Sequence, residues 1–82
     1  MGEIDLVMRE GETWVFVEVK FRSAIQHGSP EEFFTSVKQR KVLNAVRHFL
    51  LDNNLNEFDT PIRIDVVALY GDTLEWFKNV TG

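Results

Sequence analysis

Two stretches with the side-chain period of a β-strand, near the start of the chain, constrain the fold more than any other feature. Ile4–Met8 and Thr13–Lys20 both place apolar residues at every second position. The polar segment Arg9–Glu12 between them contains a glycine, so we predict a β-hairpin with its loop there. The expected cross-strand pairs are Met8 with Thr13, Asp5 with Phe16, and Glu3 with Glu18.

The two faces of this hairpin differ in chemistry. One face gathers charges at one end and continues with apolar side chains: Glu3, Asp5, Val7, Trp14, Phe16, Glu18 and Lys20. The other face is almost wholly apolar: Ile4, Leu6, Met8, Val15, Val17 and Val19. We predict that the aliphatic face is the core, because a slip of one residue would place the carboxylates among the aliphatics.

The charged end of the hairpin combines carboxylates with an ammonium group. Carboxylate oxygens bind hard cations such as Mg²⁺, which is usually held by one or two carboxylates together with substrate phosphates. Such a metal activates water and neutralises charge that builds on phosphorus. Lys20 follows Glu18 by two residues and shares its face, where it could orient the water or offset phosphate charge. The spacing is equally compatible with a solvent-facing salt-bridge cluster.

The remainder of the chain predicts one helix and two strands. Apolar residues at spacings near three to five predict a helix that ends at the asparagine-rich segment Asp52–Asn56. The stripe consists of Phe33, Val37, Val42, Val46, Phe49 and Leu50. Ile62–Leu69 is rich in β-branched residues and predicts a buried strand, and Thr73–Val80 predicts a final strand. The order predicts an α/β fold in which Ile62–Leu69 pairs in parallel with Val15–Lys20 across the helix.

The helix has two candidate starts. Ser29–Glu32 is a capping box, with a serine cap, proline at the first helical position and glutamate three residues after the cap. Thr35 and Ser36 could supply a second cap. One long helix, and a short turn followed by a long helix, are both compatible with the pattern.

Length and composition limit the kinds of protein that this sequence can encode. Eighty-two residues make one small domain, residues 1–82, and chains near this size bury only about 60–65% of their unfolded surface. We therefore expect self-association, as a homodimer, to cover exposed apolar surface. The absence of cysteine excludes disulfides, thiol nucleophiles and cysteine-based zinc sites. No signal peptide, lipidation motif or long apolar segment is recognisable, so we expect a cytoplasmic protein that does not bind membranes.

Charge is distributed unevenly along the chain. The net charge is −4, but residues 20–48 carry +4 and the remainder carries −8. The basic part offers a phosphate-facing side, with an electrostatic attraction that is modest and strongly dependent on salt. Arg22 and His27, in the segment that follows the hairpin, are candidates for phosphate contact, although a solvated loop histidine is the commoner case.

Several blocks of the sequence together resemble a known family. They are Gly2–Leu6, Val15–Lys20, Gly28–Pro30, Lys38–Gln39 and Ile64–Ala68, in this order and spacing. The set is similar to the YraN-like family, small bacterial proteins assigned to the PD-(D/E)XK nuclease superfamily near the archaeal Holliday-junction resolvases. The resemblance covers nearly the whole chain and implies a restriction-endonuclease-like core.

The resemblance also implies a site. It assigns Asp5, Glu18 and Lys20 to the metal and catalytic positions, and Gln39 to the helix that follows the catalytic strands. The implied cofactor is Mg²⁺ or Mn²⁺, bound by Asp5 and Glu18 with the Val19 carbonyl. It gives no such role to Asp65, for which we expect an ion pair at a strand edge or a loop contact.

The chain departs from the family pattern in two ways. Family members carry an N-terminal helix with an acidic residue and a first strand before the Gly-Glu-Ile-Asp block, whereas this sequence begins at Met1. Phe21 stands where a small polar residue, often threonine, is usual. We expect the first difference to remove an acidic group and part of the cover of the sheet.

These observations support two hypotheses on function. In the first, the chain is a metal-dependent endonuclease that hydrolyses phosphodiester bonds in DNA, including branched DNA, with Arg22 and Lys38 holding the substrate. In the second, it is a catalytically inactive module on a nuclease-like fold that binds nucleic acid or another protein.

Overall fold

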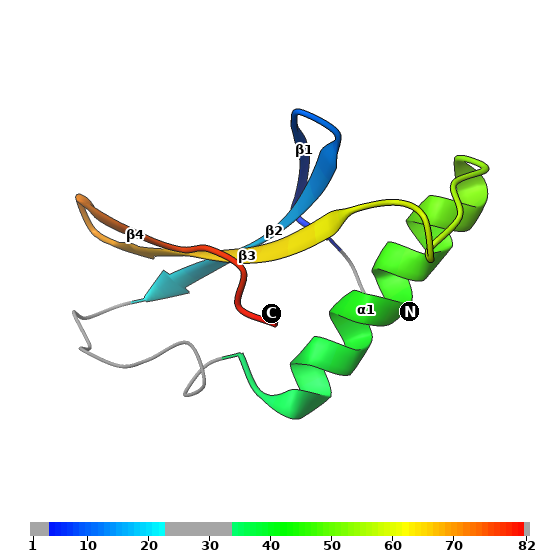
Figure 1. Ribbon diagram of the computed structural model, residues 1–82. Helices are drawn as coiled ribbons and strands as arrows, with labels where there is room; N and C mark the ends of the chain where they lie inside the picture. The colour runs from blue at the N-terminus through cyan, green and yellow to red at the C-terminus, as the bar shows by residue number, and fades with distance from the viewer. Residues whose placement is uncertain (1–3, 23–33, 82) are drawn as a thin grey trace.

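The chain forms a mixed four-stranded sheet with one helix packed on it, as the computed structural model shows for residues 4–22 and 34–81 (Figure 1). In chain order the elements are β1 (Leu6–Glu10), β2 (Thr13–Arg22), α1 (Ser36–Asp52), β3 (Ile62–Tyr70) and β4 (Thr73–Phe77). The strands lie in the order β1–β2–β3–β4. The predicted α/β fold is confirmed, and this arrangement is compatible with a restriction-endonuclease-like core.

The centre of the sheet is a parallel pair. β2 and β3 are in register from Trp14 opposite Ile62 to Arg22 opposite Tyr70, while β1 and β4 join as antiparallel edge strands. The crossover between β2 and β3 contains α1, as parallel strands require. The predicted parallel pairing across the helix is therefore confirmed.

The register of the β1–β2 hairpin differs from the prediction by two residues. Leu6 faces Val17 and Glu10 faces Thr13, so the strands extend to a two-residue turn at Gly11 and Glu12. Gly11 has a φ of +60°, which suits the first position of a type II′ hairpin turn. Because the shift is an even number of residues, the paired side chains of β1 and β2 keep their predicted faces, whereas Ile4, which precedes β1, packs against the helix-side core.

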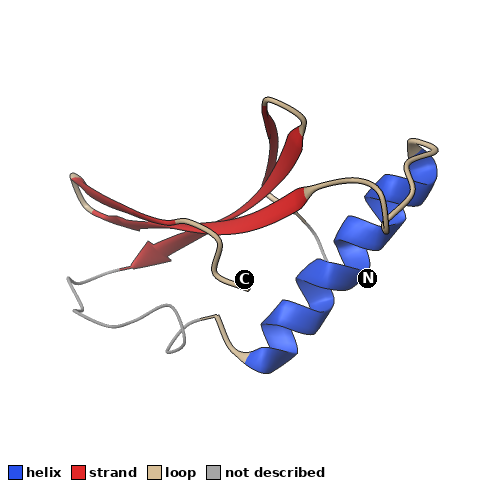
Figure 2. Cartoon of the chain, viewed as in Figure 1, coloured by secondary structure: helices blue, strands red, loops and turns tan. Residues whose placement is uncertain are grey.

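The prediction of which face is the core was wrong. Figure 2 shows α1 on one side of the sheet, and this helix-side face is the mixed one that carries Trp14 and Phe16. Phe49 of α1 makes edge-to-face contacts with both aromatic rings, with centroids 5.2 Å and 5.3 Å away. The buried core comprises Phe16, Phe34, Val42, Val46, Leu50, Ile64, Val66, Ala68 and Tyr70.

The register of β3 explains this choice of face. Its residues on the helix side include Ile64, Val66 and Ala68, all fully buried, whereas its opposite side begins with Arg63 and Asp65. Packing α1 on the other side would have placed a helix over these two charges, at a large desolvation cost. The helix therefore covers the face that is apolar along β3 and that carries Trp14 and Phe16 on β2.

The ends of α1 agree with the second of the two predicted starts. Thr35 is the N-cap, and its hydroxyl oxygen accepts a hydrogen bond from the Lys38 amide at 3.3 Å. The Ser29–Glu32 capping box and Phe33 lie outside the described residues. At the other end the Asn53 side-chain amide donates to the Phe49 carbonyl at 2.8 Å, and Asn54 adopts a φ of 56°, as predicted for an asparagine stop.

The observed elements differ from the predicted ones in two details. Val37 was placed in the apolar stripe, but it is half exposed on the first turn of α1, and Ala45 takes part in the buried face instead. The last strand ends at Phe77 rather than Val80, and Asn79 beyond it has a φ of 56°. Within residues 4–22 and 34–81, no helix is both long and apolar enough to cross a membrane.

Candidate active site

The predicted site lies at the open end of the β1–β2 hairpin, on the helix-side face. Asp5 immediately precedes β1, and its Oδ2 accepts a hydrogen bond from the Val19 amide at 2.8 Å. The two-residue change in register brings this about, because it moves Asp5 from the predicted position opposite Phe16 to the neighbourhood of Glu18 and Val19. Asp5 is therefore nearer to Glu18 than the sequence predicted.

Glu18 and Lys20 form the second part of the site. Lys20 Nζ lies 3.3 Å from Glu18 Oε1, and each side chain retains 19% of its accessible surface. Both side chains stand two residues apart on β2 and share one face, as the strand period predicts. The pair is therefore partly desolvated and keeps some contact with solvent.

Two of the predicted metal ligands are carboxylates, the type of ligand that hard divalent cations prefer. Asp5 Oδ2 accepts a hydrogen bond from the Val19 amide, its Oδ1 makes no hydrogen bond to the residues that the structure describes, and Glu18 supplies a second carboxylate. Two carboxylates, a backbone carbonyl such as that of Val19, and water match Mg²⁺ or Mn²⁺, which retain several waters in proteins. Among the residues that the structure describes, no cluster of three or more acidic, histidine or cysteine side chains could hold a metal ion.

The other predicted site residues occupy the neighbouring elements. Gln39 is half buried on the first turn of α1, which lies toward the same end of the molecule as the end of β2 (Figure 1). Within the described part of the chain, the Gln39 side chain makes no hydrogen bond to Asp5, Glu18 or Lys20. Lys38 is exposed on the same turn. Arg22 is the last residue of β2, opposite Tyr70.

Some candidate residues lie outside the described ranges. These are Glu3, His27 and the Gly28–Pro30 block, together with the Arg22 side chain. Their predicted roles in binding metal or phosphate stay predictions.

Asp65 forms a separate and fully satisfied cluster. Its side chain is 0% exposed and accepts four hydrogen bonds: two from Arg63 at 3.0 Å, one from Trp76 Nε1 at 2.9 Å and one from the Asn79 amide at 2.9 Å. Burial alone would raise the pKa of this carboxyl, but these hydrogen bonds and the Arg63 charge lower the pKa below its ordinary value. The predicted ion-pair role of Asp65 is confirmed.

The sequence did not reveal the partners of Asp65. Arg63 also donates to Glu10 Oε1 at 3.0 Å, so its side chain links β3 to β1 across the intervening strand β2. The Asp65 and Glu10 carboxylates raise the pKa of Arg63, although its burial alone would lower the pKa. The one clue in the sequence was the spacing of two residues between Arg63 and Asp65, which places both side chains on the same face of a strand.

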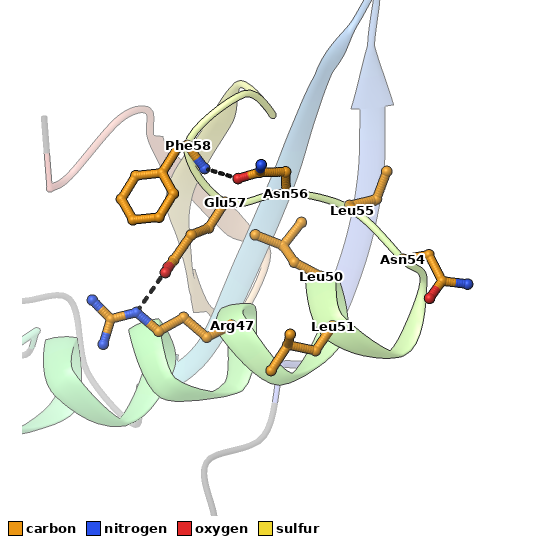
Figure 3. Close-up of a pocket in the computed structure, with 8 residues that line it drawn as sticks. All are labelled: Arg47, Leu50, Leu51, Asn54, Leu55, Asn56, Glu57 and Phe58. Carbon is orange, nitrogen blue, oxygen red and sulfur yellow. Dashed lines mark hydrogen bonds and ion pairs between the residues drawn. The ribbon is translucent and has the colours of Figure 1, made fainter.

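A second concave region lies away from the candidate site, where α1 ends. Figure 3 shows this pocket of about 500 Å³ between the last turns of the helix and the loop that follows. The Arg47 guanidinium and the Glu57 carboxylate pair across it at 3.1 Å, and the exposed ring of Phe58 stands at its rim. No periodic signal relates these residues, so the sequence did not predict the pocket.

Comparison with known proteins identifies the family. The profile of the uncharacterised protein family UPF0102 matches residues 1–69. A UPF0102 protein of Aeromonas hydrophila is 46% identical over 78 residues, which cover 95% of this chain and 60% of the relative. A UPF0102 protein of Colwellia psychrerythraea is 46% identical over 82 residues, covering 95% of this chain and 64% of the relative.

A third relative shows the same degree of similarity. A UPF0102 protein of Lachnoclostridium phytofermentans is 46% identical over 79 residues, covering 96% of this chain and 66% of the relative. The chain thus spans less than two thirds of the length of these relatives. The family relationship expected from the motifs is confirmed: the chain belongs to the uncharacterised protein family UPF0102.

Proposed function

We propose that this chain carries the active site of a metal-dependent endonuclease that hydrolyses phosphodiester bonds in DNA, branched DNA included. The observation that supports this best is that Asp5 accepts a hydrogen bond from the Val19 amide, which lies between Glu18 and Lys20, two side chains that form an ion pair at 3.3 Å. Two carboxylates with an adjacent ammonium match what metal-assisted phosphoryl chemistry needs.

Each residue has a defined role in this proposal. Asp5 and Glu18 hold Mg²⁺ or Mn²⁺ together with the Val19 carbonyl. When bound, the metal lowers the pKa of a water ligand and neutralises charge at the phosphate. The Lys20 ammonium orients the attacking water and offsets negative charge on the phosphate oxygens. Arg22 and Lys38 contact the DNA backbone, and Gln39 positions the substrate from the start of α1.

The Val19 amide is a positioning group in this scheme. By donating to Asp5 Oδ2, it holds that carboxylate against β2 and directs the second oxygen away from the strand. A carboxylate that is anchored in this way loses less conformational entropy when it binds a metal.

The proposal is tested by cleavage of labelled linear, flapped and four-way DNA with Mg²⁺ or Mn²⁺. Glu18→Gln and Lys20→Ala should each lower the rate by about a hundredfold or more, because each removes several kcal/mol of charge stabilisation. Glu12→Gln and Lys78→Ala are the matched controls, since both residues are exposed and lie outside the site. Cleavage that is unchanged in Glu18→Gln, or that is lost equally in the controls, would contradict the assignment.

One observation favours a second candidate function, a nucleic-acid-binding or protein-interaction module without catalysis. Within the described residues Lys20 already pairs with Glu18, and the nearby acidic groups number only two. A module of this kind would bind DNA or a protein with an affinity that neither Mg²⁺ nor Glu18→Gln changes. Metal-dependent cleavage that Glu18→Gln removes would exclude it.

A further inference from the structure

The solvent-facing side of α1 is strongly basic in a protein whose net charge is −4. Four of the nine lysine and arginine residues of the chain lie between Lys38 and Arg47, and no acidic residue occurs among residues 36–51. The buried residues of α1 pack on the sheet, so the exposed ones face away from it (Figure 2). Arg40, Lys41 and Arg47 are exposed in this way and are called the α1 basic face here.

The charges of the α1 basic face are little used within the chain. Among the residues that the structure describes, neither Arg40 nor Lys41 makes an ion pair or a side-chain hydrogen bond. Arg47 pairs with Glu57 at 3.1 Å, but the two side chains are 63% and 43% exposed, and exposed pairs of this kind contribute little to stability. An anionic ligand could therefore contact all three cations without breaking a contact on which the fold depends.

The position of these cations along α1 is unfavourable for the helix itself. A helix carries positive partial charge at its start, where acidic side chains stabilise it and basic ones oppose it. The described residues of the first turn of α1 include Lys38 and no acidic side chain, and Arg40 and Lys41 follow in the second turn. Like charges three residues apart, such as Lys38 and Lys41, also repel each other. Helix stability therefore does not account for this arrangement, which instead suits an anionic ligand.

From these features we propose that the α1 basic face binds the phosphate backbone of duplex DNA and extends the contact from Lys38 along the outer side of the helix. The choice of DNA rests on the proposed function, but the contact itself needs no metal. Arg40 and Arg47 are seven residues apart, about 10.5 Å along the helix axis. Duplex DNA carries roughly six phosphate charges over that length, so one duplex offers a partner to each cation. A helix that lies on a membrane inserts its apolar face, whereas α1 buries its apolar face against the sheet.

The salt dependence of DNA binding tests the proposal. Fluorescence anisotropy of a labelled linear duplex is measured in EDTA from about 50 mM to about 200 mM NaCl, so that no cleavage occurs. The double variant Arg40→Gln/Lys41→Gln should reduce the slope of log K against log salt concentration by about 1.8 and weaken binding at least about tenfold, because two phosphate contacts are lost. The exchange Arg40→Lys/Lys41→Arg keeps both charges and should keep the slope. Lys78→Gln, which removes an exposed cation after β4, should keep it as well.

The outcomes separate this proposal from the catalytic one. Glu18→Gln should bind the duplex with the wild-type slope in EDTA even though it does not cleave, so loss of cleavage alone leaves the binding surface in place. The single variants Arg40→Gln and Lys41→Gln should each reduce the slope by about 0.9, which tests the surface without the double change.

Three results would overturn the proposal. They are a wild-type chain that does not bind the duplex, a slope that the double variant retains, and a slope that Lys78→Gln reduces as much as Arg40→Gln does. Tighter binding to phosphatidylserine vesicles than to the duplex, lost in the same double variant, would also overturn it and assign the α1 basic face to an anionic membrane.

Discussion

Asp5 and Asp65 are both carboxylates within the sheet, and their surroundings give them opposite roles. Asp65 is fully buried and accepts two hydrogen bonds on each oxygen, so no lone pair remains for a metal. Asp5 is exposed and uses one oxygen for the Val19 amide, and within the described ranges its other oxygen accepts no hydrogen bond. The number of hydrogen bonds that each carboxylate accepts therefore distinguishes Asp65, a structural residue, from Asp5, a functional candidate.

Asp65→Asn is expected to destabilise the fold by roughly 3 kcal/mol at neutral pH, because it leaves the Arg63 charge without its buried partner. Asp59→Asn is the matched control, since Asp59 is exposed and its carboxylate makes no ion pair within the described residues. Urea denaturation measures both. Equal effects of the two substitutions would show that the Asp65 cluster contributes nothing specific.

The same cluster predicts a pH dependence of stability. The pKa of Asp65 is lower in the folded chain than its ordinary value, so its contribution is complete above the ordinary aspartate pKa, about 4. The contribution is lost as the pH falls from there through the lowered folded pKa. The difference in unfolding free energy between wild type and Asp65→Asn should therefore shrink below pH about 4. A difference that stays constant down to pH about 2 would contradict this assignment.

At the scale of elements, the start of α1 depends on one side chain. Thr35 caps the helix through the Lys38 amide, and the described residues of the first turn include no acidic side chain to assist it. The cap satisfies one of the amide groups that a helix leaves unpaired at its start.

Thr35→Ala should therefore lower the free energy of unfolding by about 1 kcal/mol, and Thr35→Ser should restore most of it, because serine keeps the hydroxyl. Thermal denaturation followed by circular dichroism measures both variants. If alanine and serine had the same effect, the hydroxyl would not be the stabilising group.

For the whole molecule, metal binding provides a test that is independent of catalysis. A cation held by Asp5 and Glu18 binds the folded chain only, and at a concentration of about 100 times its dissociation constant it adds about 2.7 kcal/mol of stability. Mn²⁺ or Mg²⁺ should raise the melting temperature of the wild type and not that of Glu18→Gln. Glu12→Gln should respond as the wild type does. A shift that Glu18→Gln retains would place the metal elsewhere.

Much of the candidate site could be predicted because strand geometry is local. The period of two put Glu18 and Lys20 on one face of β2 whatever the register, since an error of two residues leaves the faces unchanged. Turn chemistry decided the register itself: Gly11 closes a tighter turn than the polar segment suggested. That local difference moved Asp5 beside Val19.

Pattern and propensity in the sequence alone determined the order of elements, the faces of each strand, the asparagine stop of the helix and the parallel central pair. Only the tertiary structure decided which face of the sheet is the core. Both faces of β2 carry large apolar side chains, and the choice depended on the placement of Arg63 and Asp65 by β3 and of Phe49 by α1. Burial is a property of elements packed together, so no single strand contains that information.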